Sequence, residues 1–123
     1  MEFIDNKPIY MQMADRLMDD IVAGVYSAED RVPSVREYAM TLGVHTNTAV
    51  KAYDELSRMN IIYNKRGLGY FVHPDAKRHI VERRKHEFLN IRLRQLHHEM
   101  TLLNLSVEEV AQMLRTINTV TES

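Results

Sequence analysis

Residues 33–56 read PSVREYAMTLGVHTNTAVKAYDEL, and this stretch decides the fold. Ser34 and Glu37 form the S-x-x-E pattern of a capping box, in which both side chains accept hydrogen bonds from amides that the first helical turn leaves free. The apolar residues that follow recur at i, i+3, i+4 and i+7 and mark one face of a helix. They are Val35, Tyr38, Ala39 and Leu42. Pro33 keeps an earlier helix from running into this one, and Gly43 ends it.

A second helix follows this glycine almost at once. Its apolar residues repeat the same spacing and are Ala49, Ala52, Tyr53 and Leu56. Thr46, Asn47 and Thr48 favour the N-cap position, so we expect one of them to cap a helix over residues 46–59. Two helices joined by a tight glycine turn predict a helix-turn-helix.

The segments on either side extend this prediction. Pro8 opens an upstream helical pattern with Ile9, Met13, Leu17 and Ile21 on its apolar face. Residues 24–33 have the composition of a loop. Downstream, residues 61–64 and 70–73 are β-prone runs joined by Lys65-Arg66-Gly67-Leu68-Gly69, which predicts a hairpin with a basic tip.

The predicted fold is therefore mainly α with a small β-hairpin wing: a winged helix-turn-helix over residues 1–74. In this arrangement the last helix of the motif protrudes far enough to enter a major groove, and the hairpin tip lies beside it. Four tyrosines fall on or beside the apolar faces, and we expect them to pack in the core with their hydroxyls in water. They are Tyr10, Tyr38, Tyr53 and Tyr70.

Residues 75–123 read as two amphipathic helices, the second opened by a capping box at Ser106 and Glu109. Their apolar seam exceeds what a small winged domain can cover, so we expect a second copy to bury it in a twofold dimer. The alternative is a monomer in which both helices fold back as a cap. The expected interface residues are Phe88, Leu89, Leu93, Leu96, Met100, Leu103, Val110 and Leu114.

Composition excludes several classes of protein. With 45% hydrophobic and 27% charged residues in a chain of 123, a soluble globular protein is expected. The chain has no cysteine, and its six histidines include no H-x-x-x-H pair, so we expect no disulfide, metal site or cofactor. No spacing points to a catalytic constellation, and we expect no enzymatic activity. The first seven residues are not a signal peptide and no apolar run approaches the ~20 residues of a membrane span, which predicts a cytoplasmic protein without a membrane partner.

The net charge of −1 conceals a basic middle. Residues 34–98 carry 12 basic and 6 acidic side chains, which suits either a polyanion-binding surface or a solvated one. No acid precedes Asp54 in the third helix, so we expect Lys51 to contact phosphate, with a solvated lysine as the alternative. Arg36 is expected to face DNA; the alternatives are that it is a solvated helix residue or that it pairs with an acid such as Asp30.

Five blocks of the sequence, in order and at familiar spacing, resemble the DNA-binding domain of the GntR family. They are Pro8-Ile9-Tyr10-Met11-Gln12, Arg31-Val32-Pro33-Ser34-Val35-Arg36-Glu37, Leu42-Gly43-Val44, Asn47-Thr48 with Ala52-Tyr53-Asp54-Glu55-Leu56, and Arg66-Gly67-Leu68-Gly69-Tyr70-Phe71-Val72. The likeness covers about residues 8–73. The Ala-Tyr pair and the short C-terminal tail are similar to the YtrA-type branch, whose members carry two C-terminal helices for dimerisation.

This resemblance implies transcriptional regulation, usually repression, by a homodimer on a palindromic operator. In that family the residues matching Arg36, the start of the third helix and the wing glycine lie at the DNA. The full candidate DNA-binding set is Ser34, Arg36, His45, Thr46, Asn47, Thr48, Lys51, Lys65, Arg66 and Gly67.

The sequence departs from the family pattern at three places. Ala28-Glu29 and Asn60 replace usual glycines, and Thr46 replaces a basic residue or proline. We expect the fold to survive these changes, but the operator cannot be transferred from relatives. A protein–protein interaction module is the alternative function, against which the basic wing argues. A small-molecule effector is left open, with no site for one evident in the sequence.

Overall fold

The structure is a computed structural model that describes residues 6–122, with side chains through residue 118. Most of the N-terminal tail expected before Pro8 lies outside this range. The chain divides into two compact units, which we call unit 1 (Met1–Arg83) and unit 2 (Arg84–Ser123).

Helix α1 (Ile9–Val22) forms the base of unit 1. Pro8 occupies its N-cap rather than its first helical position, and Ile9 is exposed, so the predicted apolar face begins at Met13. Gln12 is the buried polar residue on this face, and its amide nitrogen donates to the carbonyl of Lys7 at 2.7 Å. This hydrogen bond offsets the cost of burying the amide.

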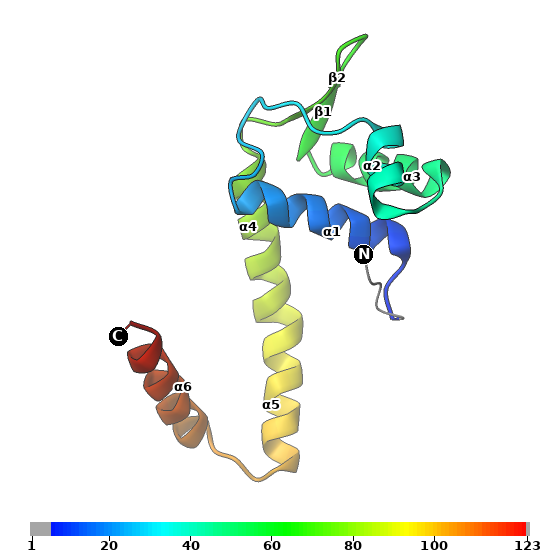
Figure 1. Cartoon of the computed structure of the whole chain (residues 1–123). Helices are drawn as coiled ribbons and strands as arrows, with labels where there is room; N and C mark the ends of the chain where they lie inside the picture. Colours follow the sequence, from blue (N-terminus) through cyan, green and yellow to red (C-terminus); the bar gives the residue numbers. More distant parts are fainter. Residues whose placement is uncertain (1–5, 123) are drawn as a thin grey trace. The chain divides into compact units, whose positions relative to one another are not determined.

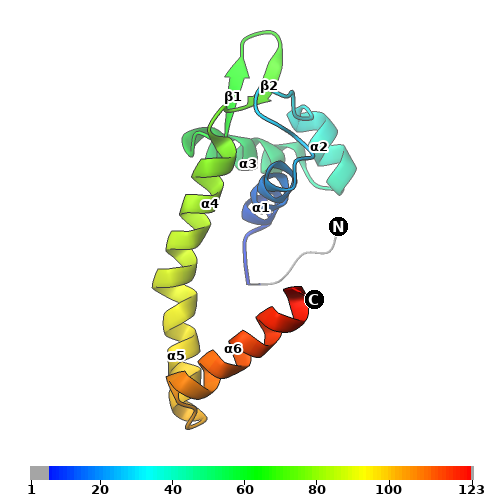
Figure 2. The same ribbon diagram turned by 90° about the vertical axis from the view of Figure 1, so that its left-hand side faces the viewer.

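The helix-turn-helix consists of α2 (Val35–Leu42) and α3 (Thr46–Arg58). The predicted capping box is present: Ser34 Oγ accepts from the amide of Glu37 at 3.1 Å, and Glu37 Oε1 accepts from the amide of Ser34 at 3.4 Å. Gly43 ends α2 at φ +68°, a left-handed conformation that costs glycine little. In Figures 1 and 2 both helices lie over α1, and the wing points away from it.

Three tyrosines join these elements at the centre of unit 1. Tyr53 is fully buried, and its ring lies 5.9 Å from that of Tyr38 and 5.1 Å, edge-on, from that of Tyr70. The expectation of wet hydroxyls is wrong for two of them. Tyr53 donates to the carbonyl of Pro33 at 2.5 Å and Tyr38 to that of Met13 at 3.1 Å. Burial raises the pKa of both phenols above the ordinary value, so they remain neutral donors.

The wing is an antiparallel hairpin of β1 (Ile62–Lys65) and β2 (Gly69–Val72). Residues 29–32 run along the other edge of β2, although the sequence reads them as loop. The amide of Glu29 donates to the carbonyl of Val72 at 2.9 Å, and the amide of Val32 donates to that of Tyr70 at 3.0 Å. The wing therefore has a third, irregular strand from a segment far away in the sequence.

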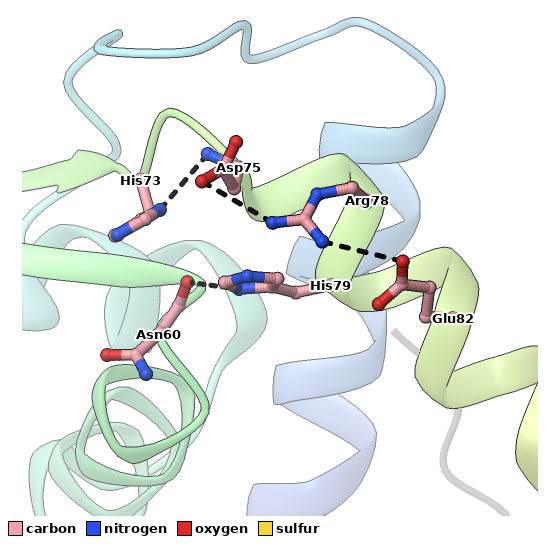
Figure 3. Close-up of polar contacts among 6 residues, drawn as sticks. All are labelled: Asn60, His73, Asp75, Arg78, His79 and Glu82. Atoms are coloured by element: carbon pink, nitrogen blue, oxygen red, sulfur yellow. Dashed lines mark hydrogen bonds and ion pairs between the residues drawn. The ribbon is translucent and has the colours of Figure 1, made fainter.

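Helix α4 (Ala76–Glu87) begins in unit 1, where Ala76 and Ile80 are buried in the core. Figure 3 shows the polar contacts that fix its first turns. His73 Nδ1 accepts from the amide of Asp75 at 3.0 Å, and His79 Nδ1 lies 3.2 Å from the carbonyl of Asn60, to which it must donate. Arg78 pairs with Asp75 and with Glu82, both on exposed surface.

Asn60 is one of the residues at which the sequence departs from the family pattern. It adopts φ +58°, and Glu29 adopts φ +70°. Both positions where the family usually has glycine thus keep a backbone conformation that suits glycine. The fold survives these substitutions, as expected, with two side chains in a region that L-residues avoid.

Unit 2 contains the end of α4, a π-helical turn η1 (Phe88–Arg92), α5 (Leu93–Leu102) and α6 (Val107–Glu122). The sequence pattern did not predict the π-helical turn. Within it, Asn90 Nδ2 donates to the carbonyl of His86 at 2.8 Å. Ser106 Oγ accepts from the amide of Glu109 at 3.1 Å, which confirms that Ser106 caps α6. Among the described residues, no helix is long and apolar enough to cross a membrane.

Candidate nucleic-acid interface

The first helical residue of α3 is Thr46, as the predicted range 46–59 has it, but the N-cap residue differs from the prediction. His45 is the N-cap residue, and its side chain makes no capping hydrogen bond. Thr46, Asn47 and Thr48 all lie inside the helix, so the expectation that one of them caps it is wrong. Only two residues separate Gly43 from the first residue of α3, so the helix begins directly after the turn. Thr46 and Asn47 are exposed and Thr48 is half-buried.

This helix start suits an anion. No acidic side chain lies in the first turn, and no side chain caps the free amides. The amides and the positive end of the helix dipole therefore favour a phosphate group. Ala49, Ala52, Tyr53 and Leu56 hold the opposite face in the core.

Farther along α3, the basic side chains of Lys51 and Arg58 each contact a neighbouring side chain. Lys51 is exposed, but its Nζ lies over the ring of Tyr10 from α1, 4.3 Å from the centroid. Arg58 forms an ion pair with Glu55, whose pKa this hydrogen bond lowers. Lys51 can still contact phosphate from the α1 side of the helix, whereas Arg58 is already neutralised by its partner.

Val50 is a residue of this surface that the sequence analysis did not select. Its side chain is 40% exposed, one turn beyond Thr46 and Asn47. An apolar residue beside a buried stripe reads as core from the sequence. Its spacing of three residues from Asn47 was the signal that both lie on one outward face.

The start of α2 contributes Arg36. Its side chain is exposed in the first turn of that helix. The alternative of a pair with Asp30 is not found, because Asp30 instead accepts from the amide of Ser27 at 2.8 Å. Ser34 caps the helix with its Oγ, which accepts from the amide of Glu37, and its O–H group remains available as a donor.

The wing tip consists of exposed Lys65, Arg66, Gly67 and Leu68. Lys65 Nζ lies over the ring of Phe71, 4.4 Å from the centroid, and 5.7 Å from that of Tyr63. Gly67 adopts φ +80° with open space around its Cα. The tip therefore presents Arg66 and bare backbone, with Lys65 lying back along one face of the hairpin.

The predicted interface residues of unit 2 are mostly exposed. The exposed fraction is 51% for Phe88, 44% for Leu93 and 69% for Leu103, whereas Met100 is buried. Between α5 and α6 lies a groove of about 300 Å³ lined almost wholly by apolar side chains. The lining residues are Leu93, Leu96, His97, Met100, Val107, Val110, Ala111 and Leu114. Leu89 and Leu114 are more than half exposed as well.

The described residues contain no group of three or more histidine, aspartate or glutamate side chains that could hold a metal ion. His73 and His79 come closest to a cluster, with ring centroids 5.5 Å apart. Each already uses its Nδ1 in a hydrogen bond to backbone. These two histidines therefore have a structural role at the start of α4.

Comparison with known proteins finds a matching family model and several similar proteins. The family model described as bacterial regulatory proteins, gntR family, matches residues 9–72. The chain is 36% identical over 115 residues to the HTH-type transcriptional regulator YhcF of Bacillus subtilis, covering 94% of this chain and 93% of that protein. It is 32% identical over 111 residues to the HTH-type transcriptional repressor YtrA of the same organism, covering 90% and 85%.

A solved structure has a similar fold. The crystal structure of a GntR-family transcriptional regulator from Bacteroides thetaiotaomicron superposes with a TM-score of 0.83 at 40% identity. The match covers 92% of this chain and 99% of that one. The likeness extends well beyond the winged part.

Proposed function

This chain belongs to the gntR family of bacterial regulatory proteins, and we propose that it is a homodimeric repressor that binds a palindromic operator. It is a transcriptional regulator, like its relatives, which form a non-enzymatic class. The start of α3 carries the proposal: it is exposed, free of acids and uncapped by any side chain. We place its site of action in the cytoplasm.

In the proposed complex, α3 enters the major groove by its first two turns. His45, Thr46, Asn47 and Thr48 lie where side chains of a recognition helix approach base edges. Arg36 reaches the same groove from α2, where its planar fork suits the two acceptors of a guanine. Ser34 positions Arg36 through the capping box.

The cations around this surface are assigned to the DNA backbone. Arg66 and the bare backbone of Gly67 contact the sugar-phosphate chain beside the groove. Lys51 and Lys65 lie over aromatic rings, which orient their ammonium groups and leave them accessible. Such contacts add affinity without sequence information.

Dimerisation is assigned to the helices over residues 75–123. A row of exposed leucines on a charged helix is costly in water unless a partner covers it. Two copies related by a twofold axis bring the same apolar surface together, so each copy can cover the other. Such a dimer would set two α3 helices about 34 Å apart, on half-sites one turn of DNA apart or a multiple of this. Repression is supported by the likeness to the YtrA repressor over 90% of this chain.

The test is selection of bound fragments from a random duplex library, followed by light scattering of the free protein. We expect one inverted repeat to be enriched and a particle of twice 14.4 kDa. Replacing Arg66 with Ala should weaken binding to all duplexes and lower the salt slope by about one. A monomer, or a protein that shifts no duplex at low salt, contradicts the proposal and favours a protein-binding role.

A further inference from the structure

Arg31 lies on the third strand of the wing, in the segment that the sequence reads as loop. It forms an antiparallel bridge with Phe71 of β2. On either side, the carbonyl of Asp30 accepts from the amide of Val72 at 2.9 Å, and the amide of Val32 donates to the carbonyl of Tyr70 at 3.0 Å. The backbone of Arg31 is thus fixed to the wing by its neighbours' hydrogen bonds.

This pairing decides which way the side chain points. Residues opposite one another in antiparallel strands share a face, as do residues two apart along one strand. Arg31 therefore shares the outer face of the wing with Phe71, Gly69 and Lys65. Val32, Ile62 and Val72 alternate to the inner face and are buried.

The guanidinium of Arg31 lies against Gly69, at the base of the wing turn. A Cβ at that position would lie 3.1 Å from Nε of Arg31, 3.5 Å from Nη2 and 3.7 Å from Cζ. An alanine at position 69 would require the guanidinium to move by a few tenths of an ångström. The group therefore lies in close contact with the backbone of Gly69, beside the turn that carries Arg66 and Gly67.

The N–H groups of this guanidinium are available as hydrogen-bond donors. Within the described part of the chain, no hydrogen bond or ion pair of the Arg31 side chain is found. The acids of its neighbourhood have other partners. Glu29 accepts from the hydroxyl of Tyr63, Asp30 from the amide of Ser27, and Glu37 from the amide of Ser34. An exposed fork of N–H donors without a partner is suited to a phosphate group.

We propose that Arg31 binds a phosphate of the DNA backbone beside the one that the wing tip contacts. This inference rests on the proposed function, because the anion it names belongs to the duplex that α3 enters. Arg31 then completes a row of cations on the wing with Lys65 and Arg66, two from the hairpin and one from the segment before α2.

The experiment measures the salt dependence of binding by fluorescence anisotropy, using the full chain with a duplex that it selects from a random library and with an unrelated duplex. Arg31→Met keeps the aliphatic stem over Gly69 and removes the charge, and Arg31→Lys keeps the charge. Arg78→Met is the matched control, because Arg78 is an exposed arginine of unit 1 already paired with Asp75 and Glu82.

We expect Arg31→Met to lower the slope of log K against log salt by about 0.9, with about tenfold weaker binding to both duplexes at 0.1 M salt. Arg31→Lys should keep most of the slope, and Arg78→Met should leave the slope and the affinity unchanged. These results together support a phosphate contact at Arg31.

Three results overturn the inference. An unchanged slope in Arg31→Met, with a lowered melting temperature, assigns Arg31 to wing packing alone. A loss confined to the selected duplex makes it a base contact. If the unaltered protein binds neither duplex, the proposed function fails and this inference fails with it, whereas the first two results leave the proposed function intact.

Discussion

Units 1 and 2 use their apolar residues in opposite ways. Unit 1 buries its large side chains, with Leu17, Tyr53 and Leu56 fully inaccessible. In unit 2, Met100 is the one buried hydrophobic residue among those described, while Phe88, Leu89, Leu93 and Leu103 are all exposed. Unit 1 therefore has a core of its own, whereas unit 2 leaves most of its large apolar side chains uncovered, which is the surface that the proposed dimer would bury.

The two units are also suited to two different functions. The rigid core of unit 1 holds α2, α3 and the wing in one fixed arrangement, as reading DNA requires. The apolar surface of unit 2 is suited to association. Mutations in the two units should accordingly give different signatures, one independent of protein concentration and one dependent on it.

The largest effect is expected from Leu93→Asp in unit 2. A charge at the centre of an apolar interface cannot be desolvated cheaply, so we expect monomers of 14.4 kDa by light scattering. Operator affinity should fall at least about a hundredfold, since a monomer engages only one half-site. Val25→Asp, at an exposed apolar residue of unit 1, should change neither property. An intact Leu93→Asp dimer would move the interface elsewhere.

The next largest effect is expected from a substitution in the core of unit 1, compared with one on the exposed surface of unit 2. Leu17→Ala leaves a cavity in unit 1 and should lower the free energy of unfolding by about 2–5 kcal/mol at any protein concentration. Leu103→Ala, at a residue 69% exposed, should act only where the protein associates. Urea unfolding at two protein concentrations measures both effects. Equal, concentration-independent losses would show that unit 2 has a core of its own.

Arg36→Ala tests the DNA-binding surface of unit 1 without touching its core. If Arg36 reads a base, binding to the selected operator should weaken by about 1–3 kcal/mol, and binding to random duplex should hardly change. Anisotropy titrations with both duplexes measure the difference, and Arg78→Ala is the control. An equal loss on both duplexes would make Arg36 a phosphate contact.

The smallest expected effect is the difference in stability between alanine substitutions at the two glycines of the wing turn. Gly67 and Gly69 both have positive φ, at +80° and +108°, but only Gly69 has a neighbour within 4 Å. Alanine at either position should cost about 1–3 kcal/mol from backbone strain. Gly69→Ala should cost more, because its Cβ meets Arg31. The difference between the two, measured by thermal unfolding, should vanish if the Arg31 contact is absent in solution.

Local patterns in the sequence predicted the local structure well. The capping box at Ser34 is confirmed because its two hydrogen bonds join residues three apart. The end of α2 at Gly43 and the buried stripes of α2 and α3 are confirmed for the same reason. Position along a helix fixes which face a residue occupies, and this needs no knowledge of distant segments.

Several features of the structure were predicted wrongly or not at all. The N-cap of α3 is His45 rather than a later residue, because packing of both helices sets where the chain reverses. The π-helical turn at Phe88 and the third strand of the wing had no signal in the local pattern. Neither did the tyrosine hydroxyls bound to backbone carbonyls 20 and 25 residues away.

The sequence by itself determined the family, the order of helices and hairpin, and the acid-free start of α3. Periodicity, capping and composition are local properties that one chain displays in full. Only the tertiary structure decided that Arg31 lies on Gly69, that Lys51 lies over Tyr10 and that Arg36 does not pair with Asp30. These relations join residues far apart in the chain, and the folded backbone alone brings them together.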